Sequence, residues 1–511
     1  MLEGAGIVVR RISFIGAAAS GLLLAGCATP WIRDAPVESV GAQSMPASFP
    51  RRPGLAPSER ELLRDRPLEW GLALSGGGLR SALFSVGVLK SLYDRGALQQ
   101  VDIVSTVSGG GYTAYWLFAN ELAEPGAGRF GRSSLSDERF PGRVCELITK
   151  SNFVTYGRLG RVLPFRIGPR SAKLYEKSLL RTFGGADRVK PPIRISEFRA
   201  PIEQRVMPYL IMNATIDNPS VQRSWPHKLI EFTPLFFGAG DFGYRPWTEA
   251  SGGSSLPVRH IASVSGAAFS PLKQEVDVQE PSSGRHPLIL WDGGKSENLG
   301  AFALIMRGVR NIVVSDAEHD PAYRFPAYQM LRNNLVLYNL TLRIGDIEDH
   351  LKPGNKPPYA RAVSVGHVTD AAGKPVSTIY YVKASMAEQI APALAEQMDD
   401  DSPGGKAQAR FMEDIRRTAE RPGGPWRCEQ LATSPLQLNI WSAHNAGSYA
   451  DYLNRRNLKV KLMNAVGDVV WRDVKIGFPQ YSTGDQSFFR DQALAFIGLG
   501  YLEAEQLPRQ P

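Results

Sequence analysis

Two glycine-rich segments, Ser75-Gly76-Gly77-Gly78 and Ser108-Gly109-Gly110-Gly111, constrain the fold of this chain most. Each follows an apolar run with the length of a buried strand, at 69–75 and at 101–107, and each precedes an apolar pattern of helical period. Alternating strands and helices predict a largely parallel sheet covered by helices. Chemistry is then expected at the carboxyl ends of the strands, where both segments lie.

The rest of the chain continues this pattern as one large domain over 67–505. At 511 residues, with 43% hydrophobic and 21% charged residues, the composition is that of a globular protein with a sizeable core. The pattern weakens over 127–260, which predicts an insertion that carries a cap or lid. Expected helices cover 81–95, 109–124, 299–308, 385–398 and 405–419, and expected strands cover 208–215, 288–291, 311–315, 362–368, 377–383 and 458–471.

The first segment is expected to stabilise negative charge. Gly76, Gly77 and Gly78 leave their backbone N–H groups unobstructed before a helix N-terminus. The anion is either a bound phosphate or the oxyanion of an acyl-transfer intermediate. Nucleotide binding is disfavoured because Ser81 stands where a dinucleotide loop needs its third glycine, and no Gly-Lys-Ser/Thr follows.

Ser108 is the candidate nucleophile, since a serine between a strand and glycines is typical of a nucleophile elbow. Thr106 replaces the first glycine of that motif, and the alternative is a serine that caps the following helix. The chain has seven histidines, none in a motif that recommends it as a base. Asp292, which ends an apolar strand before two glycines, is the candidate base, and a simple β-turn is the alternative.

Together these motifs resemble the patatin-like phospholipases, in particular the branch of the cytosolic phospholipases. Ser75 to Arg80 resembles the oxyanion loop of that family, Val107 to Gly110 its nucleophile turn, and Asp292 to Leu299 the segment with its catalytic aspartate. Weaker similarities occur at 213–215, 265–269 and 482–486. The resemblance implies a three-layer α/β/α sandwich with a mainly parallel central sheet, an inserted cap and a C-terminal extension.

The resemblance also implies a lipid acyl hydrolase of the phospholipase A or lysophospholipase type. It gives a Ser108/Asp292 dyad without histidine, an oxyanion hole from Gly76, Gly77 and Gly78, and Gly109 in the substrate site. Arg80 either contacts the phosphate of the lipid head group or braces the loop. An acyltransferase with the same acyl-enzyme, and a catalytically silent lipid-binding lipoprotein, are the alternatives.

The N-terminus has the anatomy of a signal peptide over residues 1–26, with two arginines before an apolar stretch too short to span a bilayer. Leu24-Ala25-Gly26-Cys27 resembles the lipobox of bacterial lipoproteins, which implies lipid on Cys27 and, with Ala28 next, the outer membrane. An ordinary signal peptide is the alternative. Residues 27–66 are rich in Pro, Arg and Ser and are expected to form a tether to the folded body.

Composition and charge bear on the partners of the chain. The formal net charge of +9 favours anionic lipid surfaces, or is a solvated surface. Nucleic acid is not expected, because the basic residues are dispersed and no zinc-ligand spacing or aromatic RNA-binding signature occurs. No cofactor and no metal are expected, and the oligomeric state is not predicted. Cys145 and Cys428 form a disulfide or stay as separate thiols.

Overall fold

The structure is a computed structural model. It describes residues 38–41, 55–64, 67–124, 129–149, 170–188, 191–217, 228–239, 243–247, 255–268, 273–280, 284–354, 361–385, 387, 479–480, 483 and 490–508. The signal peptide, Cys27, Cys428 and the side chain of Cys145 lie outside the described residues. So do the elements expected at 405–419 and 458–471 and, apart from residues 385 and 387, the helix expected over 385–398.

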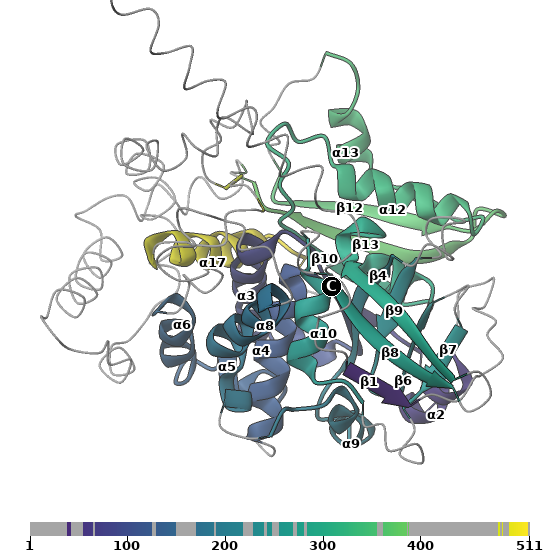
Figure 1. The fold of residues 1–511 in the computed structure, drawn as a ribbon. Helices are drawn as coiled ribbons and strands as arrows, with labels where there is room; N and C mark the ends of the chain where they lie inside the picture. Colours follow the sequence, from purple (N-terminus) through teal and green to yellow (C-terminus); the bar gives the residue numbers. More distant parts are fainter. Residues whose placement is uncertain are drawn as a thin grey trace, which may run out of the picture.

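The described residues form an α/β fold around one 13-stranded sheet (Figure 1). The strands are β1 (Glu38–Gly41), β2 (Trp70–Leu74), β3 (Ile103–Val107), β4 (Tyr209–Ile216), β5 (Leu229–Phe232), β6 (Phe236–Ala239), β7 (Gly243–Pro246), β8 (Gln274–Glu280), β9 (Gly284–Asp292), β10 (Asn311–Asp316), β11 (Thr341–Arg343), β12 (Val363–Thr369) and β13 (Pro375–Lys383).

Helices connect and cover these strands (Figure 1). They are α2 (Pro57–Leu63), α3 (Gly78–Asp94), α4 (Gly109–Ala123), α5 (Arg132–Leu135), α6 (Phe140–Thr149), α8 (Arg170–Phe183), α9 (Arg199–Glu203), α10 (Val258–Ser265), α11 (Ala301–Ile305), α12 (Pro326–Val336), α13 (Gly345–His350) and α17 (Arg490–Glu505). Short 3-10 turns lie at Leu98–Gln100, Gly185–Arg188, Ile195–Phe198 and Gly293–Lys295, the last labelled η8. None of the described helices is long and apolar enough to cross a membrane.

The main path of the sheet runs β1-β8-β9-β4-β3-β2-β10-β13-β12-β11. Its centre, from β4 through β3, β2 and β10 to β13, is parallel, whereas β9 runs antiparallel to β4 and the hairpin of β12 and β13 closes the other side. The predicted α/β fold with a mainly parallel centre is therefore confirmed. The sheet as a whole is mixed, because β5 to β9, β11 and β12 add antiparallel pairs.

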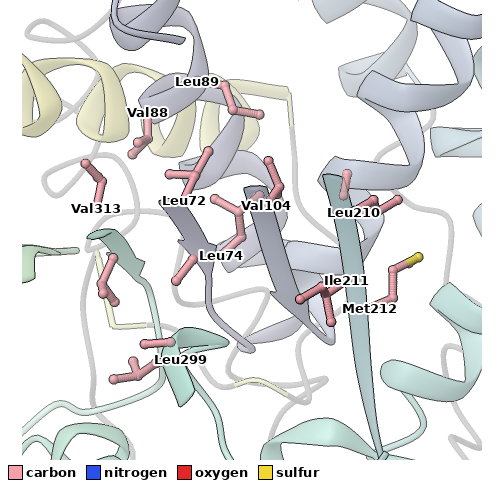
Figure 2. Packing of buried hydrophobic residues seen from close by; sticks show 14 of the residues in the cluster. Leu72, Leu74, Val88, Leu89, Val104, Leu210, Ile211, Met212, Leu299 and Val313 are labelled. Carbon is pink, nitrogen blue, oxygen red and sulfur yellow. The ribbon is translucent and has the colours of Figure 1, made fainter. Parts of the chain in front are cut away.

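The two faces of the sheet carry different helices, as the alternation of side chains along β2 shows. A Cβ at Gly71 would lie 3.1 Å from a methyl group of Leu304 in α11, whereas Leu74 lies against Gly110 in α4. Residues of opposite parity in a strand point to opposite faces. The sheet is thus the middle of three layers. Figure 2 shows Leu72 and Leu74 of β2 in the core with Val104 of β3 and with Val88 and Leu89 of α3.

The structure corrects two of the predicted boundaries. Helix α2 lies inside the segment predicted as a tether, yet Glu59 is buried and pairs with Arg307, so residues 55–64 belong to the folded body. A helix of two turns is too short for its apolar periodicity to be recognised in a proline-rich segment. The range 127–260 is not only a cap, because β4 lies in it, fully buried beside β3.

Candidate active site

The corner between β3 and α4 presents Ser108 in a strained backbone conformation. Ser108 has φ 48° and ψ −115°, a region that non-glycine residues rarely occupy. Two glycines allow the turn, because a Cβ at Gly109 would lie 2.1 Å from the Gly78 carbonyl oxygen and one at Gly110 would lie 2.3 Å from the Leu74 carbonyl oxygen. The nucleophile turn therefore packs directly against the end of β2 and the glycine loop that follows it.

The Ser108 hydroxyl donates a hydrogen bond to Asp292 Oδ2 at 2.9 Å. Among the described residues this carboxylate is the only hydrogen-bond partner of Ser108 Oγ. The alternative in which Ser108 caps α4 does not occur, since its side chain makes no cap hydrogen bond. Both residues are buried, with 3% of Ser108 and 6% of Asp292 exposed. A hydroxyl held by a buried carboxylate is the arrangement that a Ser/Asp dyad requires.

Asp292 reaches Ser108 because of the register of β9. This strand runs antiparallel to β4 and pairs Asp292 with Ala214, while Asn213 pairs with Val107 on the other side of β4. The strand therefore ends level with the nucleophile turn, although it enters the sheet from the opposite direction. The predicted position of Asp292 next to Ser108 is correct, but the strand that carries it is not one of the parallel ones.

Both oxygens of the Asp292 carboxylate are used. Oδ2 accepts from Ser108, and Oδ1 accepts the Gly294 N–H at 2.7 Å, which makes the turn that the sequence also predicts. Burial raises the pKa of Asp292 to about 6, against the opposing effects of the Gly294 N–H, the Ser108 hydroxyl and the Lys295 ammonium. A carboxylate with this pKa is a better proton acceptor than an exposed aspartate and is still ionised at neutral pH.

The glycine loop offers two of the three predicted oxyanion donors. The N–H of Gly76 donates to the Asn298 carbonyl at 2.8 Å, so Gly76 is not a free donor and its predicted role is corrected. Its role is steric, since a Cβ there would lie 2.1 Å from Asn298 Oδ1. Gly77 and Gly78 have φ 139° and 63°, and the N-cap residue Gly77 makes no side-chain cap hydrogen bond within the part of the chain that the structure describes. Their N–H groups begin a helix and are orphan donors.

Arg80 braces the glycine loop. The residue is 1% exposed, its Nε donates to the Ala317 carbonyl at 2.7 Å, and its guanidinium also reaches Thr483 Oγ1 at 3.4 Å. Of the two roles considered for Arg80, these contacts fit the brace. They tie the first turn of α3 to the end of β10 and to the C-terminal part of the chain.

Several residues that position the dyad were not singled out by sequence reasoning. Ser265 Oγ accepts the Ser108 N–H at 2.7 Å and donates to the Asn213 carbonyl at 2.6 Å. Thr215 Oγ1 donates to the Asp292 carbonyl at 2.8 Å and contacts Ser296 Oγ at 2.9 Å. Ser265 and Thr215 lie in segments noted for family similarity, but only the register of the sheet assigns their contacts.

One further carboxylate holds the loop after Asp292. Glu297 is buried and accepts the N–H groups of Leu299 and Phe302 at the start of α11, and burial raises its pKa to about 7. It therefore fixes the loop that delivers the Asn298 carbonyl to Gly76. Within the described residues, no group of three or more His, Cys, Asp or Glu side chains is arranged to hold a metal ion.

Comparisons with known proteins find one family for the central part of the chain. A family model described as patatin-like phospholipase matches residues 72–305, the range that contains both glycine-rich corners and Asp292. No curated protein sequence matches the chain.

One solved structure supports the fold, and two others are less similar. Human GIVD cytosolic phospholipase A2 is similar with a TM-score of 0.52 and 13% identity, covering 88% of this chain and 63% of that one. The same human enzyme in complex with methyl gamma-linolenyl fluorophosphonate gives a TM-score of 0.46 at 14% identity, covering 88% and 62%. VipD from Legionella pneumophila gives 0.24 at 13%, covering 87% and 93%. This chain thus spans less than two thirds of the human enzyme.

Proposed function

Because residues 72–305 form a patatin-like phospholipase domain, we propose that this chain is a lipid acyl hydrolase that cleaves fatty-acyl esters through Ser108 and Asp292. The observation that carries the proposal is the hydrogen bond of 2.9 Å between the Ser108 hydroxyl and the buried Asp292 carboxylate. A third residue is not needed, because the carboxylate itself accepts the proton.

The proposed reaction has two stages. In the first, Asp292 accepts the Ser108 proton while Ser108 Oγ attacks the ester carbonyl carbon, and the N–H groups of Gly77 and Gly78 stabilise the oxyanion. Asp292 then gives the proton to the departing alcohol. In the second stage Asp292 takes a proton from a water molecule, whose oxygen attacks the acyl carbon of the acyl-enzyme. The bond from that carbon to Ser108 Oγ then breaks, Asp292 returns the proton to Ser108 Oγ, and the fatty acid leaves. The position of the glycine loop against the nucleophile turn supports this assignment.

The test measures fatty acid release from phosphatidylcholine vesicles by the wild type and by Ser108→Ala and Asp292→Asn. Both variants are expected to lose nearly all activity. Ser91→Ala is the matched control, since Ser91 is a buried serine in α3 whose hydroxyl has no partner among the described residues. Undiminished release by both dyad variants contradicts the proposal.

Water is proposed as the acyl acceptor, and the same experiment separates hydrolysis from transfer. When a lysophospholipid is added, a hydrolase continues to release free acid, whereas an acyltransferase forms diacyl lipid faster than free acid. A wild-type protein whose Ser108 fails to react with an active-site serine probe supports the silent lipoprotein instead.

We also propose that lipid on Cys27 holds the enzyme at the outer membrane, beside acyl-lipid substrate. The support is the tetrapeptide Leu24-Ala25-Gly26-Cys27 after an apolar stretch of signal-peptide length. Mass spectrometry of the protein from a bacterial envelope is expected to show a chain that begins at lipidated Cys27. An unmodified Cys27 in the mature protein excludes the anchor.

A further inference from the structure

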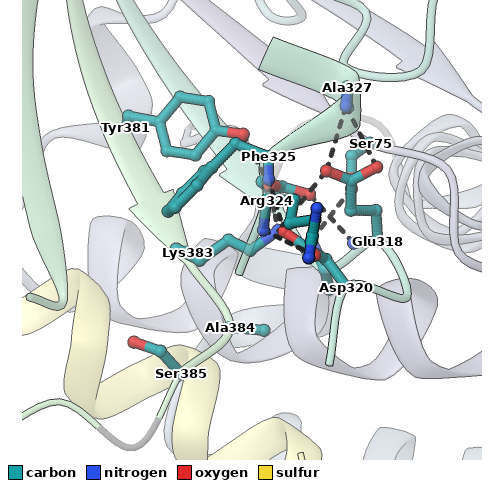
Figure 3. A network of polar contacts seen from close by, with 12 residues as sticks. Ser75, Glu318, Asp320, Arg324, Phe325, Ala327, Tyr381, Lys383, Ala384 and Ser385 are labelled. Carbon is teal, nitrogen blue, oxygen red and sulfur yellow. Dashed lines mark hydrogen bonds and ion pairs between the residues drawn. The ribbon is translucent and has the colours of Figure 1, made fainter. Parts of the chain in front are cut away.

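A buried cluster of charged residues lies at the carboxyl ends of β10 and β13 (Figure 3). Lys383 is fully buried, and its ammonium lies 2.7 Å from Asp316, 3.5 Å from Glu318 and 3.7 Å from Asp320. The Tyr381 hydroxyl also donates to Asp316, at 2.5 Å. Lys383 is thus the shared partner of three buried carboxylates.

Electrostatics make the cluster depend on Lys383, the cation that pairs with all three carboxylates among the residues that the structure describes. Burial alone would lower the pKa of Lys383, but Asp316, Glu318 and Asp320 outweigh it and raise the pKa. Burial raises the pKa of Glu318 to about 7, with Asp316 and Asp320 adding to the rise and Lys383 opposing it. Removal of one partner from a buried charged group leaves uncompensated charge, which is strongly unfavourable. Without Lys383 the three carboxylates would repel one another.

Ala317 connects the cluster to the oxyanion loop. It follows Asp316 directly, its N–H donates to Ser75 Oγ at 3.0 Å, and its carbonyl accepts Arg80 Nε at 2.7 Å. The same carbonyl lies against the loop, because a Cβ at Gly77 would come within 2.4 Å of it. A displacement of the end of β10 would therefore move Ser75, Gly77 and Arg80 together.

The C-terminal part of the chain closes the cluster from the other side. Gln480 accepts the Asp320 N–H at 2.8 Å and donates to the Ala384 carbonyl at 2.9 Å, and Ala384 follows Lys383. Glu503 of α17 accepts the Ser385 N–H at 2.9 Å. All these residues lie beyond 305, the end of the matched family region. The support of the oxyanion loop is therefore built by a part of the chain outside that region.

We propose that Lys383 is a positioning residue for the oxyanion hole, acting through Asp316 and Ala317 to hold the Gly77 and Gly78 N–H groups in place. The inference rests on the proposed hydrolase function. It assigns Lys383 no contact with substrate. Its effect is expected on the step in which the oxyanion forms, since a misplacement of about 1 Å in a catalytic group can cost ~100-fold in rate.

The experiment compares Lys383→Met with Lys90→Met in the full chain, using p-nitrophenyl butyrate as a soluble ester. Lys90 is the matched control because it is equally buried, pairs with Asp94 and Asp137, and lies on α3, the helix that the oxyanion loop begins. It stands twelve residues after Gly78, about 18 Å along the helix. Circular dichroism gives the folded fraction, so that kcat is expressed per folded molecule.

Lys383→Met is expected to lower kcat by ~100-fold with KM within about threefold, whereas Lys90→Met keeps kcat within about threefold of wild type. The pH midpoint of kcat, which reports Asp292, is expected to stay near 6 in both variants. A general loss of structure would lower both variants alike. A wild-type kcat per folded Lys383→Met molecule overturns the inference.

Two further variants keep the test decisive. If Lys383→Met does not fold, Asp316→Asn, which has the same shape and weakens the same ion pair, is expected to lower kcat by about tenfold, and an unchanged kcat overturns the inference. Ser75→Ala is also expected to lower kcat, because it removes the acceptor of the Ala317 N–H. In the double variant Ser75→Ala/Lys383→Met, the reductions of kcat in the two single variants are expected not to multiply, because both act through the Ala317 contact. Fully multiplicative losses overturn that route. A wild type without esterase activity, or an active Ser108→Ala, contradicts the proposed function itself.

Discussion

The two glycine-rich corners end neighbouring parallel strands, β2 and β3, yet they solve different problems. In the first, Gly77 and Gly78 take positive φ, and the proposed chemistry uses their backbone N–H groups. In the second, Ser108 takes a positive φ, and the proposed chemistry uses its side-chain hydroxyl. The proposed oxyanion site therefore uses glycines, which adopt positive φ without steric cost, whereas the proposed nucleophile is a serine held in a conformation that suits glycine better.

The second corner therefore stores strain that the first avoids. A non-glycine residue in such a region costs of order 1–3 kcal/mol and persists only when surrounding contacts fix it. For Ser108 those contacts are the Ser265 hydroxyl on its N–H and the close approach of Gly109 to Gly78. Ser108 is thus held by contacts from the last residue of α10 and the first residue of α3.

Substitution of Ser108 is expected to have the largest effect on activity and separates the catalytic role of the second corner from its backbone strain. Ser108→Ala and Ser108→Gly are both expected to lose at least ~10⁴-fold in kcat, because no acyl-enzyme forms. Their stabilities should differ, since glycine relieves the positive φ and alanine does not. We expect Ser108→Gly to be about 1 kcal/mol more stable than Ser108→Ala in urea unfolding. Equal stabilities would show that the corner holds no backbone strain.

Asp292→Asn removes the base and also a buried charge. Its kcat is expected to fall by ~10³-fold, since an amide accepts the Ser108 proton poorly. The folded-state pKa of Asp292 is raised to about 6, so the stability this group contributes is present below pH 4 and is lost as the pH rises through 6. At pH 8 the asparagine variant should be more stable than wild type by up to about 3 kcal/mol.

Urea unfolding of Asp292→Asn and wild type at pH 4 and pH 8 checks this sign. The difference in the free energy of unfolding is expected at pH 8 and should nearly vanish at pH 4, where the wild-type carboxyl group is protonated. A variant less stable than wild type at pH 8 would show that the hydrogen bonds of Asp292 outweigh its desolvation.

Gly77→Ala tests the first corner. A Cβ at φ 139° would lie 2.4 Å from the Ala317 carbonyl oxygen, so the loop must shift and the oxyanion donors move. We expect kcat to fall by ~100-fold with KM little changed. Gly142→Ala in α6 is the control, because a Cβ there has no heavy atom within 4 Å among its neighbours. That variant should keep its activity and gain about 0.5–1 kcal/mol.

The sequence was sufficient for the local parts of this site and insufficient for the parts that depend on register. Strands 69–75 and 101–107 and the glycines after them were readable, because apolar runs and glycines act within a few residues of themselves. The pairing of Asp292 with Ala214 follows from an antiparallel strand, which no local pattern reveals. For the same reason the use of the Gly76 N–H by Asn298 was missed.

Charged residues in the core escaped sequence reasoning for a related cause. Arg307 with Glu59, and Lys383 with Asp316, look like ordinary surface charges in the sequence. Each becomes a buried pair only after strands or helices more than sixty residues apart have come together. These buried ion pairs form only in the folded chain, so the hydrophobic periodicity of the sequence cannot predict them.

The pH dependence of activity is expected to follow Asp292 alone. Because the carboxylate must be ionised to accept the Ser108 proton, kcat should rise with pH through a midpoint near 6, by about tenfold per pH unit below it. Stopped assays with a soluble ester between pH 4.5 and 8 measure the curve. A midpoint near 7 instead would match histidine, and would contradict a dyad in which the aspartate is the base.

Ser265→Ala is expected to have the smallest effect on kcat among these variants. It tests whether the Ser265 hydroxyl holds Ser108 at positive φ. The substitution removes the acceptor of the Ser108 N–H and the donor to the Asn213 carbonyl, without touching the dyad itself. If those bonds help to hold Ser108 at positive φ, kcat should fall by about fivefold to tenfold, and the double variant with Ser108→Gly should lose less stability than the sum of the two single changes. Ser263→Ala, two residues earlier on α10, serves as the control because its hydroxyl bonds to His260 and Gln274 instead. An additive double variant would mean that Ser265 stabilises α10 but does not hold the nucleophile turn, and the contacts of Gly109 and Gly110 would then be sufficient to fix Ser108.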